Sequence, residues 1–219
     1  MIGRRAILGA ATAMAVRPAA VSAAAALPVP AGNQLAFRMV RHGSDIGRHV
    51  LTFEQQGDTL TVRIAVDAVV TLLSVPIVRY SHHAVEVWKA GTLSTITGET
   101  NRNGEHEWIK ASRSSEGLVV LGSQTDRYVA PEPAGGASYW NRRLLGGPMI
   151  SLEDGVLLRP NVVQEPAESI PLASGGTVRA ERYKLSGSFK INLWYDETNT
   201  WASLGLSVKD GSYVHYERL

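Results

Sequence analysis

The chain of 219 residues contains no cysteine. This absence excludes disulfides, thiolate nucleophiles, sulfur-ligated metals and the lipidated cysteine that a bacterial lipoprotein needs. Avoidance of cysteine also suits a compartment in which stray thiols would be oxidised. The fold must therefore be held together by a hydrophobic core and by hydrogen-bonded strand ladders.

Amphipathic helical segments of useful length are also missing from the first half of the chain, where alternation with a period of two dominates. The clearest example is residues 183–195, in which apolar side chains occupy the odd positions and polar ones most even positions. Residues 60–66 follow the same pattern, and Asn103-Gly104 and Asp210-Gly211 are favoured hairpin turns. We therefore predict an all-β, mainly antiparallel fold, either a strongly curved meander sheet or an open barrel.

One short helix is expected, near residues 138–145. Ser138 is a suitable N-cap, Trp140 and Leu144 fall on one face, and Gly146 follows the last turn. The Pro- and Gly-rich residues 129–137 before it are interpreted as a crossover within one sheet. Residues 27–219 are accordingly predicted to form a single antiparallel β domain.

Residues 1–26 have the pattern of an export signal. Arg4 and Arg5 precede an apolar run over residues 6–16, and small residues occupy positions 23–26. The paired arginines favour the twin-arginine route, with cleavage between residues 24 and 26; a general secretory signal or an uncleaved anchor is the alternative. The run is too short and too rich in alanine for a stable spanning helix. We expect a soluble periplasmic protein without an integral membrane segment in its mature chain.

The basic character of the chain is concentrated in this segment. The sequence pI is about 9.0 and the formal net charge is +2. Arg4, Arg5 and Arg17 are the only charges before Leu27; without them 19 basic residues face 20 acidic ones, a net charge of −1. The remaining chain has no net attraction for polyanions, so no nucleic-acid partner is expected.

The six histidines do not form a metal-binding pattern. His82 and His83 are neighbours on a predicted strand and point to opposite faces, so they cannot chelate one ion together. We predict neither a metal nor another cofactor. His82 shares a face with Glu86, and the carboxylates of Glu86, Glu99, Asp196 and Glu217 are on strands that could face one cavity. An enzyme acting through these carboxylates or His82 is therefore one alternative function, although solvent-facing carboxylates are the more common case.

The aromatic residues suggest a ligand site. Trp88, Trp140 and Trp194 have polar neighbours, and Trp194 falls on the face opposite Leu193. A tryptophan on the polar face of a strand must be covered by another layer, a loop or a ligand. Tyr80, Trp88, Trp140 and Trp194 are the predicted ligand-binding residues. The alternative for Trp194 is structural packing beneath residues 139–140.

Several short segments together resemble a family. They are Ile46-Gly47, residues 86–93 (Glu-Val-Trp-Lys-Ala-Gly-Thr-Leu), residues 139–141 (Tyr-Trp-Asn), residues 193–196 (Leu-Trp-Tyr-Asp) and Asp210-Gly211. This set resembles a family of exported, mostly proteobacterial domains of unknown function, over essentially the whole chain after the signal. That family is similar to periplasmic half-barrel proteins such as the lipoprotein carriers, which hold an acyl chain in a curved sheet. The resemblance implies no catalytic residues.

The expected function is non-enzymatic binding of an apolar or amphipathic small molecule, such as a lipid or acyl chain. A long meander with few helices leaves a concave face that something apolar must fill. A cell-envelope enzyme, as above, and a protein-interaction module that docks a partner at a sheet edge or aromatic face are the two alternatives.

Overall fold

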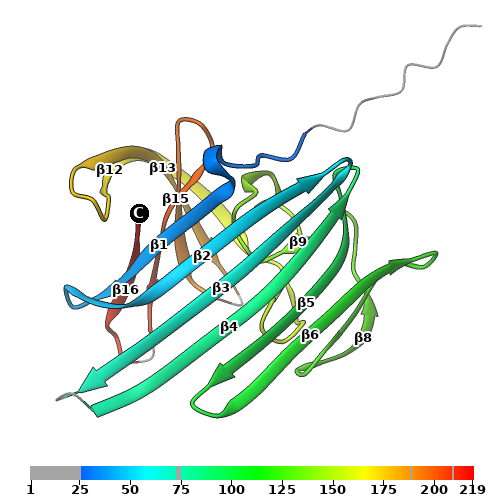
Figure 1. Ribbon diagram of the computed structural model, residues 1–219, viewed down its shortest axis with the longest axis horizontal. Helices are drawn as coiled ribbons and strands as arrows, with labels where there is room; N and C mark the ends of the chain where they lie inside the picture. The colour runs from blue at the N-terminus through cyan, green and yellow to red at the C-terminus, as the bar shows by residue number, and fades with distance from the viewer. Residues whose placement is uncertain (1–25, 73–74, 188, 209) are drawn as a thin grey trace, which may run out of the picture.

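The structure is a computed structural model that describes residues 26–72, 75–187, 189–208 and 210–219. The predicted export signal lies outside the described residues, except for its last residue. Most of the described chain belongs to one antiparallel sheet of 13 strands (Figure 1). Its first eight strands are β1 (Gln34–Arg41), β2 (Ser44–Gln56), β3 (Thr59–Leu72), β4 (Val75–Lys89), β5 (Thr92–Arg102), β6 (Glu105–Ser114), β7 (Gly117–Gly122) and β8 (Thr125–Val129).

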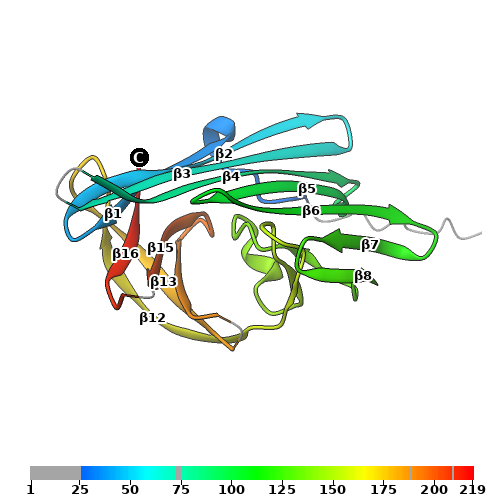
Figure 2. The ribbon, with the colours of Figure 1, turned by 90° about the horizontal axis from the view of Figure 1, so that it is seen from below.

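The remaining strands belong to the second half of the chain. They are β12 (Asn161–Pro171), β13 (Thr177–Ser186), β14 (Ile191–Asp196), β15 (Trp201–Ser207) and β16 (Tyr213–Arg218). The last strand, β16, pairs with the first, β1, so the order across the sheet is β12-β13-β14-β15-β16-β1-β2-β3-β4-β5-β6-β7-β8. Figure 2 shows β1–β6 as one broad wall and β12–β16 curving beneath it. The prediction of an all-β antiparallel meander is confirmed. In the described chain, β8 and β12 do not pair, so the sheet curls without closing into a barrel.

Residues 130–160, which we call the connecting segment, join the two edges of the sheet. They contain a small sheet of β9 (Gly135–Gly136), β10 (Met149–Ile150) and β11 (Leu157–Leu158), and the 3₁₀ helix η2 (Arg142–Leu144). Another 3₁₀ helix, η1 (Ala31–Asn33), precedes β1. Figure 2 shows the connecting segment between the two walls of the curled sheet. It fills one part of the interior.

The short helix lies within the predicted range, but its N-cap differs from the prediction. The side chain of Asn141, not that of Ser138, caps η2 by accepting a hydrogen bond from the Arg143 backbone N–H at 3.2 Å. Ser138 is instead turned inward and donates to Glu86. The Ser138 hydroxyl, which local spacing predicted to cap the helix, thus bonds to the buried Glu86 carboxylate on β4.

Period-two alternation determines which side chains face the interior. On β3, Leu60, Val62, Ile64 and Val66 are buried, whereas Arg63 and Asp67 face outward. The connecting segment packs very closely on this interior. An added Cβ at Gly98 or Gly122 would lie 2.4 or 1.9 Å from a backbone carbonyl oxygen of the segment. Only glycine at these two positions permits such a close approach.

Candidate functional site: a cavity inside the curled sheet

A cavity of about 870 Å³ lies on the concave side of the sheet. Strands from both walls line it, among them β2, β3 and β4 on one side and β14, β15 and β16 on the other, together with part of the connecting segment. Much of the lining is aliphatic, as the inward positions of the alternating strands dictate. Its size is in the usual range of small-molecule sites, about 300–1,000 Å³.

A tyrosine, a glutamate and an arginine form a hydrogen-bonded group in the cavity wall. The Tyr80 hydroxyl donates to Glu153 Oε1 at 2.6 Å, and Arg102 donates to Glu153 Oε2 at 2.8 Å. Burial, and next the Glu153 charge, raise the pKa of Tyr80 above its ordinary range, so this hydroxyl remains protonated. The carboxylate of Glu153 already has its cationic partner.

Two buried histidines also line the cavity. His49 on β2 and His82 on β4 are both opposite Val66 on the intervening strand β3, so they share the concave face two strands apart, about 10 Å. His82 Nδ1 is 2.9 Å from Thr100 Oγ1. Neither ring nitrogen of His49 has a hydrogen-bond partner. Burial, with a smaller contribution from His82, lowers the pKa of His49 to about 3, and burial lowers that of His82 as well.

The connecting segment places Tyr139 in the cavity wall with a strained backbone. Its φ of 62° is in the left-handed region, which costs a bulky residue about 1–3 kcal/mol. Hydrogen bonds hold the segment on either side of it. Ser138 Oγ donates to Glu86 Oε1 at 2.7 Å, and Trp140 Nε1 donates to Glu86 Oε2 at 3.1 Å. The Tyr195 hydroxyl donates to the Tyr139 carbonyl oxygen at 2.6 Å.

Glu86 therefore anchors the connecting segment to β4. Its side chain is fully buried, and Trp88 Nε1 supplies a third hydrogen bond at 3.0 Å. Burial raises the pKa of this carboxyl, and the three hydrogen bonds from Ser138, Trp140 and Trp88 oppose that rise. Glu86 is occupied by this structural contact and is not among the residues that line the cavity.

The structure does not bring the four predicted ligand-binding residues together. Tyr80 lines the cavity. Trp88 and Trp140 meet edge to face, with ring centroids 5.8 Å apart, in the buried core around Glu86. Neither they nor Trp194 is among the described cavity-lining residues. That these residues bind a ligand stays a prediction, but a single site made of all four does not exist in this structure.

Trp194 lies on the sheet face opposite Leu193 and Tyr195, as alternation predicts, but the alternative that it packs beneath residues 139–140 is wrong. It packs in a separate small cluster with Ile170 and Ala202, and its Nε1 donates to Glu168 Oε1 at 2.8 Å. It is therefore neither in the cavity wall nor beneath residues 139–140. Tyr195, one position on and hence on the other face, makes the contact with the connecting segment.

The four carboxylates named for an enzymatic alternative do not share one site. Glu86 is buried under its three donors, whereas Glu99 is exposed on the outer face. Asp196 accepts a hydrogen bond from Arg218, and Glu217 pairs with Arg38. The four carboxylates have different surroundings, because the alternation of side chains and the positions of their strands place them on different parts of the curled sheet.

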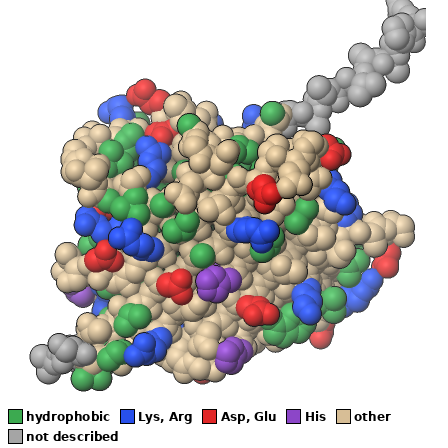
Figure 3. Space-filling view, viewed as in Figure 1, with side chains coloured by type: hydrophobic (Ala, Val, Ile, Leu, Met, Phe, Trp, Pro, Cys, Tyr) green, Lys and Arg blue, Asp and Glu red, His purple; other side chains and the backbone are tan. Residues whose placement is uncertain are grey.

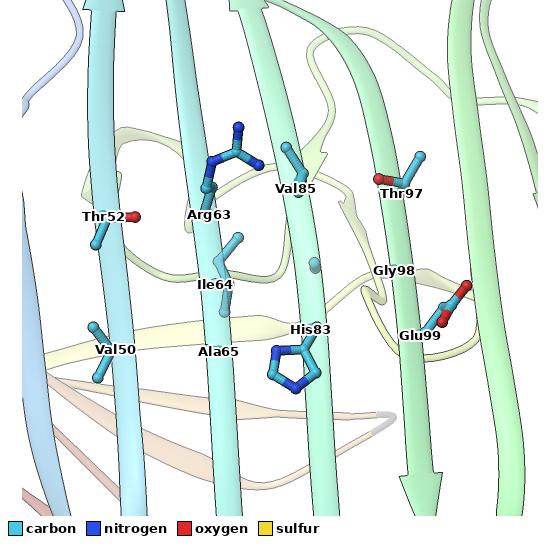
Figure 4. A pocket seen from close by; sticks show the side chains of 11 residues that line it. Val50, Thr52, Arg63, Ile64, Ala65, His83, Val85, Thr97, Gly98 and Glu99 are labelled. Atoms are coloured by element: carbon cyan, nitrogen blue, oxygen red, sulfur yellow. The ribbon is translucent and has the colours of Figure 1, made fainter.

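A second, shallower hollow of about 390 Å³ lies on the outer face of β2–β5. Arg63, His83 and Glu99 are among its lining side chains (Figure 4). Figure 3 shows acidic, basic and histidine side chains interspersed over the face of the long strands. This face has no field of one sign that would favour a polyanion or polycation.

Within residues 26–219, apart from the undescribed positions, no group of three or more His, Cys, Asp or Glu side chains is placed to hold a metal ion. No helix in the described ranges is long and apolar enough to cross a membrane.

Sequence reasoning missed His49, Tyr139, Glu153 and Tyr216 as cavity residues. His49 could have been found, because it alternates with Leu51 and Phe53 and so faces inward. Tyr216 alternates with Val214 in the same way. Tyr139 and Glu153 carry no such signal, because they belong to an irregular segment whose position depends on contacts with distant strands.

The sequence and the fold of this chain were compared with those of known proteins. A comparison with curated protein sequences gives no significant match. One similar solved structure is described as the crystal structure of a beta-barrel-like protein of domain of unknown function DUF1849 from Brucella abortus. It matches with a TM-score of 0.60 at 11% identity, covering 85% of this chain and 94% of that one. At this identity the likeness shows the fold alone. The model of the family "Domain of unknown function (DUF6134)" matches residues 37–219. The predicted resemblance to a family of unknown function, distantly similar to barrel-like proteins, is thus confirmed, and the chain belongs to the DUF6134 family.

Proposed function

We propose that this protein binds an apolar or amphipathic small molecule, such as a lipid or an acyl chain, in the cavity of the curled sheet and does not transform it. The main support for this proposal is the cavity of about 870 Å³ on the concave side of the sheet. Aliphatic residues from β3, β14, β15 and β16 line it, and binding would remove their surface from water.

The binding site is proposed to act in the periplasm, in a protein released after export. This part of the proposal depends on residues 1–26, with their paired arginines and short apolar run. A lipid moving between membranes needs an apolar cover in such an aqueous compartment, because exposed acyl chains are costly to hydrate.

Two alanines on β3 provide a matched test. Ala68 lines the cavity, whereas Ala65 lies three residues earlier on the outer face. Ala68→Phe should fill part of the cavity and weaken binding of the fluorescent apolar probe aminoanthracene at least about tenfold. Ala65→Phe should bind the probe like the wild type.

The unfolding midpoint of each variant shows whether it is folded under the assay conditions. Native mass spectrometry of protein purified from periplasm should also show an added lipid mass. The absence of both probe binding and a lipid mass in the wild type would refute the proposal. Equal loss of probe binding in both folded variants would place the site elsewhere.

A further inference from the structure

The hairpin formed by β3 and β4 extends beyond the strands on either side of it. β3 and β4 pair with each other as far as Leu72 and Val75. The pairing of β2 with β3 stops at Ala68, and that of β5 with β4 stops at Tyr80. Residues 69–71 and 75–79, which we call the hairpin end, therefore project from the lower left of the sheet in Figure 1 without a third paired strand in the described chain.

The hairpin end is apolar on both of its faces. Val70 and Val78 are opposite each other on the concave face, and Val69 falls on the outer face by alternation. The exposed fractions are 40% for Val69, 61% for Val75 and 50% for Ile77. Exposed apolar side chains that gather in one place mark an interaction surface. A protein that docks on a sheet covers one face, whereas lipid surrounds an inserted tip on all sides, so this distribution favours lipid.

The charges near the hairpin end also suit a membrane surface. Between Asp67 and Glu86 the sequence has no acidic residue, and its only lysine or arginine is Arg79, which is exposed. Asp67 itself is opposite Arg48 across the ladder between β2 and β3. Figure 3 shows hydrophobic and basic side chains together at this lower left corner of the molecule. A basic side chain close to a layer of anionic lipids strengthens binding to it.

The cavity reaches the surface beside the hairpin end. Ile77 lines the cavity and is also half exposed. Val70 and Val78 continue the apolar lining inward from this point, and Leu206 and Val208 line the cavity from the other wall. A membrane in contact with the hairpin end therefore lies at an entrance to the cavity.

We propose that the hairpin end docks this protein on the surface of a lipid bilayer, with Val69, Val75 and Ile77 at the boundary between head groups and acyl chains. Arg79 then lies among the head groups. Insertion is shallow, because the backbone groups along the free edges of a two-stranded hairpin must stay within reach of water or head groups. This inference goes beyond the proposed function. It depends on the hairpin end and holds whether or not the cavity carries a lipid.

Cosedimentation with vesicles tests the docking. The purified protein should sediment with vesicles of phosphatidylcholine mixed with phosphatidylglycerol, and more weakly with phosphatidylcholine alone. Val75→Asp should weaken binding to both at least about tenfold, because a charge replaces an inserted apolar side chain. Val163→Asp is the matched control, at a valine of similar exposure (56%) on the edge strand β12, and should bind like the wild type. All variants have the same N-terminus, so any contribution of residues 1–26 is shared.

An arginine variant tests the head-group contact. Arg79→Gln should weaken binding to the mixed vesicles about fivefold and leave binding to phosphatidylcholine alone unchanged. If the unfolding midpoint shows that Val75→Asp is unfolded, Val75→Thr takes its place. This variant keeps the branched shape and should still weaken vesicle binding about threefold, because one methyl group is replaced by a hydroxyl.

The outcomes separate docking from the proposed function. Val75 is not among the described cavity-lining residues, so Val75→Asp should bind aminoanthracene normally. If the wild type binds the probe but no vesicles, or if folded Val75→Asp binds vesicles like the wild type, the docking proposal is wrong while the proposed function stands. Vesicle binding that Val75→Asp loses, without probe binding, supports docking and contradicts the proposed function. A wild type that binds no vesicles but retains a protein partner that Val75→Asp loses would make the hairpin end a protein-docking surface and overturn the proposal.

Discussion

Removal of the Glu86 carboxylate should release the connecting segment from the sheet. Glu86→Ala deletes the acceptor for Ser138 Oγ, Trp140 Nε1 and Trp88 Nε1. All three donors belong to buried groups. An unsatisfied buried donor costs about 1–3 kcal/mol, so the variant should lose about 3–6 kcal/mol of unfolding free energy, with the three effects less than additive. That is a large share of the roughly 5–15 kcal/mol typical of a folded domain.

Glu86→Gln should behave very differently. Its amide oxygen can accept from both indole N–H groups, and its NH₂ can donate to the Ser138 hydroxyl, so every partner stays satisfied. We expect a change within about 1 kcal/mol of the wild type. Glu99→Ala, which removes an exposed carboxylate on the neighbouring strand, is the control and should change stability by less than about 0.5 kcal/mol.

The pH dependence gives an independent check of the buried carboxyl. Burial raises the pKa of Glu86 above its ordinary value of 4.5, so the folded state binds more protons than the unfolded state between the two values. The stability that this group contributes is therefore complete below pH 4.5 and is lost as the pH rises through the folded pKa. Glu86→Gln does not titrate, so its stability relative to the wild type should increase over that interval.

Denaturant unfolding followed by tryptophan fluorescence measures these differences, because Trp88 and Trp140 flank the substituted side chain. Aminoanthracene binding reports the cavity in the same samples. The reasoning would be refuted if Glu86→Ala were as stable as Glu99→Ala. A wild type that gained stability relative to Glu86→Gln with rising pH would show that the pKa of Glu86 is lowered instead.

Three further predictions concern Trp194, the close contact between Gly122 and the connecting segment, and the N-terminus. Trp194→Ala should lower the free energy of unfolding by about 3–5 kcal/mol, as large core truncations do, and should leave the aminoanthracene affinity of the folded protein unchanged. If the variant binds the probe more weakly without losing stability, Trp194 belongs to the binding site. Gly122→Ala should lower the free energy of unfolding by about 1–3 kcal/mol or more, because the added Cβ would lie 1.9 Å from the Asp154 carbonyl oxygen. Gly146→Ala is the control, because nothing lies within 4 Å of a Cβ there, and its thermal unfolding should be unchanged. N-terminal sequencing of exported protein should begin between residues 24 and 27, and material starting at Met1 would contradict cleavage.

Alternation in the sequence was sufficient to predict most strands of the large sheet and the side chains that they bury, but not β8 or β12. Alternation identified the inward face of residues 60–66, and it placed Leu193 and Trp194 on opposite faces. This works because side-chain direction in a strand is a local property with a period of two. The same locality explains the failure with Trp194, since the material that covers a face comes from distant residues. Here that material is the group of residues around Ile170, not residues 139–140.

The connecting segment shows why the site was harder to predict than the sheet. Its conformation is set by an acceptor on β4, which holds Ser138 and Trp140 and leaves Tyr139 strained between them. Local spacing favoured Ser138 as a helix cap, and nothing near it in the sequence indicates Glu86 as its partner. The hydrogen bond joins residues 52 positions apart. Patterns of propensity and spacing do not report such contacts.

Glu86 and His49 are both buried polar side chains, but only Glu86 has hydrogen-bond partners that explain its burial. Both are polar side chains on the concave face of long strands, His49 on β2 and Glu86 on β4 with β3 between them, and both are almost fully enclosed. The carboxylate has three protein donors, so its burial is explained by the contact it makes with the connecting segment. The imidazole has none, although it lines the cavity, and retaining it costs stability that an apolar side chain of similar size would not. Both ring nitrogens of His49 are enclosed by protein atoms and have no hydrogen-bond partner. The two burials therefore predict opposite effects in denaturant unfolding: loss of the Glu86 acceptor should destabilise the fold, whereas His49→Leu should keep or raise the unfolding midpoint.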